Sequence, residues 1–177
     1  MLAALEDVIS QAEKETVIVS PYISFHTRLE YVLKERIEND KLKITIVFGK
    51  ADTDMLANFE AENLAPLKGM PNIEMRHEPR LHSKYYANHH HSLLSSIDLY
   101  DFSQNEQIDF GIHVNKGGIL SGHLMPSAPD KDSNEHFEKV VENAEVVYRS
   151  VPVYEDKMLG LTKKFSHAEV EVDKLVE

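Results

Sequence analysis

The stretch "RLHSKYY" (residues 80–86) places a histidine and a lysine two residues apart at the start of an aromatic, strand-like run. In a β-strand, side chains at positions i and i+2 point to the same face, so His82, Lys84 and Tyr86 are predicted to share a face. Two interpretations follow. Either the strand has an ordinary solvated polar side, or the histidine is a nucleophile beside a cation that holds a phosphate. Taken alone, the two residues favour the solvated strand.

Upstream of this stretch, apolar runs rich in β-branched residues alternate with amphipathic helical patterns. The predicted strands are 16–23, 41–49 and 72–78, and the predicted helices are 2–14, 26–39 and 54–69. Strands that alternate with helices indicate parallel strands joined by crossover helices. The first two strands are almost continuously apolar, as expected when helices cover both faces of a sheet.

Downstream, the pattern changes to strand-like runs with short connections. These runs are 81–88, 92–100 and 107–114. Their spacing predicts an antiparallel meander added to the parallel strands, so the expected fold class is α/β with a mixed β-sheet flanked by helices. A further helix is predicted over 134–149. We expect one domain over residues 1–150 and a C-terminal extension over 151–177, whose packing the pattern does not define.

Composition limits the classes of function. The chain has 177 residues, a formal net charge of −11 and no cysteine. No apolar run approaches the ~20 residues needed to span a bilayer, and the amino terminus lacks the basic region of a signal peptide. We therefore expect a cytoplasmic protein without a membrane partner, disulfides or thiolate metal sites. The acidity disfavours a generic nucleic-acid coat, although one local basic pocket can still bind a phosphate.

The turn "HHH" (residues 89–91) raises the question of a metal site, because imidazole is a good ligand for zinc or nickel. Consecutive histidines in a turn do not all converge on one ion, and no carboxylate stands nearby at metal-ligand spacing. A solvated turn is the favoured interpretation, and no metal or cofactor is predicted. Arg76 and Arg80 are either a phosphate-attracting rim or ordinary exposed loop charges.

The predicted meander gathers further polar groups near the histidine and lysine. Ser96 and Asp98 share a face of the second strand, and Asp109 on the third strand can point to the same side. Together these residues supply an imidazole, an ammonium, a hydroxyl and two carboxylates. That is the set required for covalent phosphoryl transfer, in which histidine attacks phosphorus and lysine stabilises the developing charge.

At these residues the chain resembles the phospholipase D superfamily, and within it a bacterial nuclease-like subgroup. "LHSKYYAN" matches the His-x-Lys signature, "SSIDLYDFSQ" is similar to the Gly-Ser-x-Asn segment, and "QIDFGI" matches the acidic strand that follows. The upstream blocks "VIVSPYI" and "ITIVFGK" are similar to the first two strands of the subgroup, so the resemblance covers roughly residues 3 to 114. It implies a phospholipase D-like fold and metal-independent phosphodiester chemistry through a phosphohistidine.

The resemblance also implies a role for each matched residue. His82, Lys84 and Asp109 take the catalytic positions, and Ser96 and Asp98 take the substrate-binding positions. Asp98 stands where the family has an asparagine. An asparagine amide donates a hydrogen bond to phosphate, whereas an ionised aspartate only accepts one. The sequence therefore leaves open whether the site is active.

Other departures are smaller. His89 holds the position of the motif aspartate, and Ser95 holds that of the glycine. In the family, two copies of the motif meet at a pseudo-twofold axis, but this chain has a single His-x-Lys. The resemblance therefore implies a homodimer that joins two copies of His82 across a shared cleft.

Three functions stay open on the sequence. The first is a metal-independent, nuclease-like phosphodiesterase that acts on a phosphodiester substrate, with nucleic acid among the candidates. The second is a degenerate, non-catalytic domain that binds a phosphorylated ligand or serves in dimerisation or regulation. The third is a metal-binding protein that uses the histidine cluster.

Overall fold

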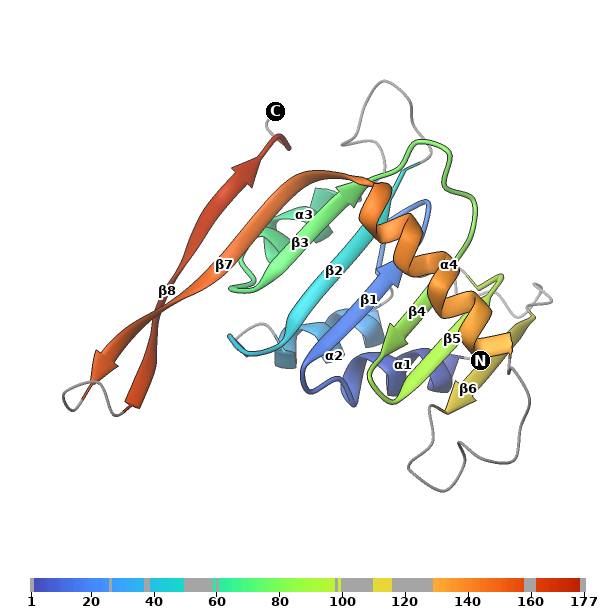
Figure 1. The fold of residues 1–177 in the computed structure, drawn as a ribbon, viewed down its shortest axis with the longest axis horizontal. Helices are drawn as coiled ribbons and strands as arrows, with labels where there is room; N and C mark the ends of the chain where they lie inside the picture. Colours follow the sequence, from blue (N-terminus) through green and yellow to red (C-terminus); the bar gives the residue numbers. More distant parts are fainter. Residues whose placement is uncertain are drawn as a thin grey trace.

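The computed structural model describes residues 2–25, 27–36, 39–49, 59, 61–97, 99, 110–115, 129–157 and 162–175. Its helices are α1 (Leu2–Ser10), α2 (Thr27–Arg36), α3 (Ala61–Lys68) and α4 (Pro129–Asn143). Its strands are β1 (Glu15–Val19), β2 (Lys43–Phe48), β3 (Ile73–His77), β4 (Tyr85–Asn88), β5 (His91–Ser95), β6 (Gly111–Asn115), β7 (Glu145–Lys157) and β8 (Thr162–Asp173). In the described part of the chain, these strands form one sheet in the order β6-β5-β4-β1-β2-β3-β7-β8 (Figure 1).

The sheet is mixed, which confirms the predicted fold class. β1, β2 and β3 are parallel neighbours at its centre. On one side the antiparallel meander β4-β5-β6 follows β1, and on the other side β7 and β8 follow β3, also antiparallel. The connections from β1 to β2 and from β2 to β3 contain α2 and α3, as expected for parallel strands joined by crossover helices.

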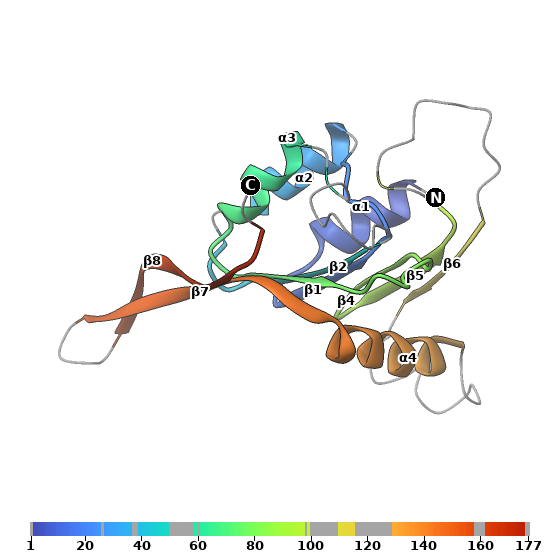
Figure 2. The same ribbon diagram turned by 90° about the horizontal axis from the view of Figure 1, so that it is seen from above.

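Helices cover both faces of the sheet: α1, α2 and α3 lie on one face and α4 lies on the other (Figure 2). The larger apolar cluster, on the α1–α3 side, includes Leu5, Ile18, Leu29, Ile46 and Tyr86. The smaller apolar cluster, on the α4 side, consists of Val19, Val47, Leu81, Tyr85, Ala87, Phe137 and Ala144. Consecutive strand residues enter opposite clusters, as Ile18 and Val19 do in β1, which explains why apolar residues follow one another in β1 and β2. Of the helices that the structure describes, none is long and apolar enough to span a bilayer.

The prediction of a helix over 134–149 is wrong at its carboxyl end. α4 ends at Asn143, and β7 begins at Glu145. The apolar spacing of α4 continues in sequence to Val147, but Val147 is buried in the larger cluster on the other face of the sheet. The run from 145 to 149 instead pairs with β3. Pairing with β3 places Val147 in the larger cluster, on the face of the sheet opposite α4.

β7 and β8 form a long hairpin that projects beyond the rest of the sheet (Figures 1 and 2). β7 runs across residue 150, where the sequence analysis places the end of the domain. Its first residues pair with β3, and from Tyr148 onward it pairs with β8. A separate role for residues 151–177 stays a prediction.

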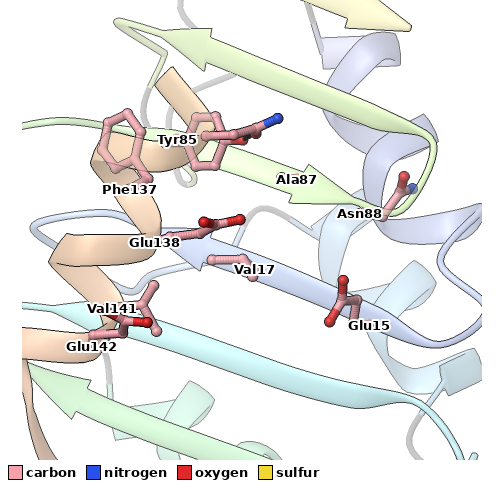
Figure 3. Close-up of a pocket in the computed structure, with 10 residues that line it drawn as sticks. Glu15, Val17, Tyr85, Ala87, Asn88, Phe137, Glu138, Val141 and Glu142 are labelled. Atoms are coloured by element: carbon pink, nitrogen blue, oxygen red, sulfur yellow. Dashed lines mark hydrogen bonds between the residues drawn. The ribbon is translucent and has the colours of Figure 1, made fainter. Parts of the chain in front are cut away.

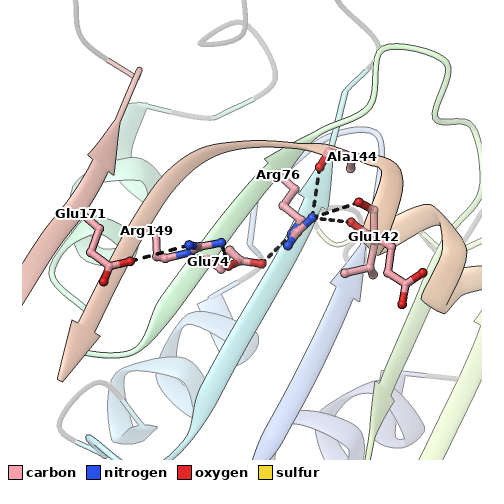
Figure 4. Close-up of polar contacts among 7 residues, drawn as sticks. Glu74, Arg76, Glu142, Ala144, Arg149 and Glu171 are labelled. Atoms are coloured by element: carbon pink, nitrogen blue, oxygen red, sulfur yellow. Dashed lines mark hydrogen bonds and ion pairs between the residues drawn. The ribbon is translucent and has the colours of Figure 1, made fainter.

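A buried ion-pair network joins β3 to β7 (Figure 4). Glu74 lies opposite Arg149 in the ladder, and its carboxylate accepts hydrogen bonds from Arg149 Nε at 2.7 Å and Arg76 Nε at 2.5 Å. Burial raises the pKa of Glu74, but the bonds from Arg76 and Arg149 outweigh that and hold it below its usual range. Arg76 Nη1 also donates to the carbonyl oxygens of Val141 and Ala144, at 2.7 and 3.1 Å, at the end of α4. Arg76 therefore serves the fold here.

Candidate functional site

Of the predicted site residues that the structure describes, His82, Lys84 and Ser96 lie at one edge of the sheet. β4 runs antiparallel to β1, so its start lies beside the carboxyl ends of the parallel strands: Tyr85 pairs with Val19 of β1 and with Leu94 of β5. The end of β5 and the start of β6 reach the same edge, since Ser95 pairs with Gly111. In open α/β sheets, ligands bind beyond the carboxyl ends of the parallel strands. This edge is therefore the candidate site.

Lys84 and Ser96 are brought together at this edge. The ammonium of Lys84 donates a hydrogen bond of 2.8 Å to the carbonyl oxygen of Ser96, and the amide of Ser95 donates to the carbonyl of Lys84 at 3.2 Å. The first bond fixes the end of a long, flexible side chain, and the second fixes its backbone. Lys84 is half-buried and Ser96 is exposed, so the contact faces the surface. The ammonium is therefore held close to the surface, beside the end of β5.

The prediction that His82, Lys84 and Tyr86 share a strand face is wrong, because β4 begins only at Tyr85. Tyr86 is fully buried in the larger cluster, and its hydroxyl donates to the carbonyl of Ile97 at 3.1 Å. Residues 81–84 instead form the connection from β3, in which Leu81 is buried in the smaller cluster. That anchor leaves the following residue, His82, exposed at the surface.

His82 lies in a groove of about 710 Å³ between this connection and α4. The other lining residues are Glu78, Arg80, Leu81, Ser83, His136, Lys139, Val140 and Asn143. Arg80 is engaged in a two-point pair with Glu78, at 2.8 and 3.2 Å, and these bonds lower the pKa of the Glu78 carboxyl. The groove thus combines imidazoles and cations with a neutralised acid, a composition that can accept an anion.

α4 contributes residues that the sequence analysis did not assign to the site. His136, Lys139 and Asn143 recur at the i, i+3 and i+7 spacing that puts side chains on one helical face. The sequence predicts these three residues only as part of the solvated face of a helix. Their position opposite residues 81–84 depends on how α4 packs on the sheet, which the periodicity of the sequence does not predict.

The hydroxyl groups of Ser95 and Ser96 connect the end of β5 to the residue before β6 through hydrogen bonds to the backbone of Phe110. Ser95 Oγ donates to the carbonyl of Phe110 at 3.1 Å and accepts from the amide of Ile97 at 3.0 Å. Ser96 Oγ accepts from the amide of Phe110 at 3.0 Å. Asp98 and Asp109, the other predicted site residues, lie outside the described part of the chain.

A second hollow, of about 260 Å³, lies between α4 and the sheet and contains no predicted site residue (Figure 3). Its apolar part includes the stacked rings of Tyr85 and Phe137, whose centroids are 4.3 Å apart. Its acidic part consists of Glu15, Glu138 and Glu142. Each carboxylate at ~4 Å would cost a phosphate about 1 kcal/mol in water and more in a dry site. This hollow is therefore unsuited to an anionic substrate.

The fold is phospholipase D-like: it is similar to the folds of solved structures, one of which is described as a phospholipase D family member. NucT from Helicobacter pylori matches over 82% of this chain and 89% of its own, with a TM-score of 0.58 and 12% sequence identity. Nuc from Salmonella typhimurium, a phospholipase D family member, matches over the same shares with a TM-score of 0.54 and 13% identity. Phosphatidylserine synthase from Haemophilus influenzae matches over 81% of this chain and 36% of its own, with a TM-score of 0.54 and 14% identity.

Comparison at the level of sequence adds nothing to these structures: no protein-family model and no curated protein matches the chain. At 12 to 14% identity, the three structures establish the fold. Substrate and reaction have to be argued from the residues at the edge of the sheet.

Proposed function

We propose that this chain is a cytoplasmic, metal-independent phosphodiesterase of the nuclease-like kind, which works as a homodimer through His82. The observation that carries the proposal is the fixed ammonium of Lys84, bound to the Ser96 carbonyl at 2.8 Å. It stands at the ligand-binding edge of a phospholipase D fold, two residues after an exposed histidine. The likeness in fold to Nuc and NucT supports the proposal.

The proposed reaction has two displacements at phosphorus. A ring nitrogen of His82 attacks the diester, a nitrogen–phosphorus bond forms, and the bond from phosphorus to the leaving oxygen breaks. The leaving oxygen takes a proton from a general acid. Water then attacks the phosphohistidine, gives up a proton to the same group, and releases a phosphomonoester and free His82.

The other predicted residues support these steps. Lys84 places positive charge on the phosphoryl oxygens as their charge grows. Asp109 orients the imidazole, because an acceptor on one ring nitrogen leaves the other as the nucleophile. Ser96 and Asp98 take the substrate-binding positions, and because an ionised aspartate would repel the anion, binding requires that Asp98 takes up a proton or is neutralised by Lys84.

The general acid comes from a second copy of the chain. The sequence contains one His-x-Lys, at His82 and Lys84. A twofold axis beside His82 would supply the second imidazole, as an isologous interface places the same residue on both sides.

The test is hydrolysis of bis-p-nitrophenyl phosphate in the presence of EDTA. We expect activity in the wild type, none in His82→Ala, and wild-type activity in His167→Ala, which removes an exposed histidine on β8. Wild type mixed with His82→Ala after subunit exchange should lose activity as the square of the wild-type fraction. Equal rates in wild type and His82→Ala contradict catalysis, and a linear loss on mixing contradicts the shared site.

One observation favours the second candidate, a non-catalytic phosphate-binding domain. The Ser96 hydroxyl already donates to the carbonyl of Phe110 at 3.4 Å, so it would have to share its proton with a substrate phosphate. Asp98→Asn discriminates between the two candidates. A large gain of activity in Asp98→Asn would show a site that the aspartate holds inactive, whereas a loss would show that Asp98 takes part in the reaction.

A further inference from the structure

A cluster of possible metal ligands lies at the opposite end of β4 from His82. It consists of Glu13, His89 and His90, whose ligand atoms all lie within 4.8 Å of one another. His89 and His90 form the turn between β4 and β5, and Glu13 lies in the connection from α1 to β1. The cluster therefore joins two segments that are far apart in the sequence.

We propose that Glu13, His89 and His90 bind one Zn²⁺ ion, which ties the β4–β5 turn to the α1–β1 connection. Two imidazoles and a carboxylate are a donor set that Zn²⁺ takes in proteins, with water completing four-coordinate geometry. The sequence alone favours a solvated turn, because no carboxylate stands near the histidines at metal-ligand spacing. The fold supplies that carboxylate from Glu13.

His89 carries the second observation that points to a ligand. Both of its ring nitrogens are shielded from solvent, and neither has a hydrogen-bond partner among the residues that the structure describes. Its Nε2 is 3.7 Å from the Glu13 carboxylate, too far for a hydrogen bond. A buried polar group without a partner costs about 1–3 kcal/mol, and metal coordination would remove that cost for one of the two ring nitrogens.

The two segments are held in place without the ion. Asn88 Oδ1 accepts hydrogen bonds from the amides of His90 and His91, at 2.6 and 2.7 Å, which fixes the backbone of the turn. Asn88 Nδ2 donates to the carbonyl of Val8 in α1 at 2.7 Å. The same side chain therefore sets the turn and attaches it to the helix that leads to Glu13.

The ligand atoms of the three residues have to move only a short distance to coordinate Zn²⁺. Four ligands at the zinc–ligand distance of about 2.0–2.1 Å stand roughly 3.3 Å apart at the corners of a tetrahedron. The ligand atoms lie within 4.8 Å of one another, so any two of them have to approach by at most about 1.5 Å. The Glu13 side chain is 74% exposed and can move, and His90 is also exposed.

His91 provides a matched control in the same turn. Its Nε2 lies 2.7 Å from Gln11 Oε1, and its ring stacks on His113 with centroids 5.4 Å apart. It is not one of the three clustered residues. If the turn merely chelated metal through neighbouring histidines, His91 would matter as much as His89.

The experiment is calorimetric titration of untagged protein with Zn²⁺, and with Co²⁺ to record the absorption of a four-coordinate site. We expect one ion per chain, with affinity lowered by about 100-fold or more in His89→Ala and about tenfold or more in Glu13→Gln. His91→Ala should bind as the wild type does, and Zn²⁺ should raise the Tm of the wild type but not of His89→Ala.

The proposal is overturned by any of three results: no stoichiometric binding, unchanged affinity in Glu13→Gln, or equal losses in His89→Ala and His91→Ala. Glu13→Gln guards against a folding artefact, because the side chain is exposed. The proposal is independent of the proposed catalysis, which uses the other end of β4 and is assayed with EDTA present.

Discussion

Charged side chains are used differently on the two sides of the sheet centre. At the β3–β7 seam, the buried carboxylate of Glu74 is shared by Arg76 and Arg149. At the β4–β5 edge, the half-buried ammonium of Lys84 donates to the backbone carbonyl of Ser96. The first arrangement neutralises charge inside the protein, and the second presents charge at the surface.

The difference separates stability from function. A buried carboxylate between two guanidinium groups cannot be removed without leaving unpaired charge in a low-dielectric place. A surface ammonium on a carbonyl contributes little to folding, because water can replace the lost bond. The seam is therefore expected to determine whether the sheet holds β7, and the edge to determine whether a phosphate is bound and turned over.

The largest expected effect tests the edge. In Lys84→Ala we expect kcat/KM for bis-p-nitrophenyl phosphate to fall about a thousandfold, or ~4 kcal/mol, because the charge on the transferring phosphoryl group loses its stabilisation. The Tm should stay near that of the wild type. Lys164→Ala, which removes an exposed lysine on β8, is the control and should keep full activity. A large fall in Tm for Lys84→Ala would show that the edge is structural after all.

The next largest effect is a loss of stability at the contact between β3 and β7. Glu74→Gln should lower the free energy of unfolding by about 3 kcal/mol, because two arginines lose their carboxylate. The Arg149 side chain is 34% exposed, so we expect a loss of stability at the lower end of the range for buried ion pairs. Urea unfolding measures it, with Glu171→Gln as the control. Glu171 lies 3.6 Å from the same Arg149 and is 46% exposed, so its loss should have little effect.

The two regions also differ in how far the sequence predicts them. The central strands follow from apolar runs that both faces of the sheet bury, as Ile18 and Val19 illustrate. β7 is not predicted because its first residues continue the apolar spacing of α4, and β8 is not predicted because most of it is exposed, so no apolar periodicity marks it. The pairing of Lys84 with Ser96 needs the register of β4 and β5. The roles of His82, Lys84, Ser96, Asp98 and Asp109 stay predictions.

Acid should affect the seam through Glu74. The paired arginines hold its folded pKa below the unfolded value, so its contribution to stability is complete above the unfolded pKa. The contribution is lost as the pH falls through the folded pKa. Unfolding free energies measured from pH 6 down to about pH 3 should therefore decline in the wild type and decline less steeply in Glu74→Gln. Parallel curves would mean that Glu74 does not titrate with unfolding. Glu78 and Glu145, whose pKa values are also lowered, will keep some slope in the variant.

The smallest change in stability is expected for an exposed ion pair on the β7 side of the sheet. Lys174 Nζ lies 2.6 Å from Glu145 Oε1, but the two side chains are 51% and 59% exposed. Lys174→Ala should therefore change the free energy of unfolding by less than about 1 kcal/mol, and salt should erase the difference. Lys68 is the informative contrast, because it pairs with Asp173 at 2.7 Å and donates to the Leu175 carbonyl at 2.9 Å from a more buried position. Lys68→Ala should be the more destabilising of the two at any salt concentration. If Lys174→Ala proved equally costly, pairing distance rather than burial would decide what a charge contributes on this side of the sheet.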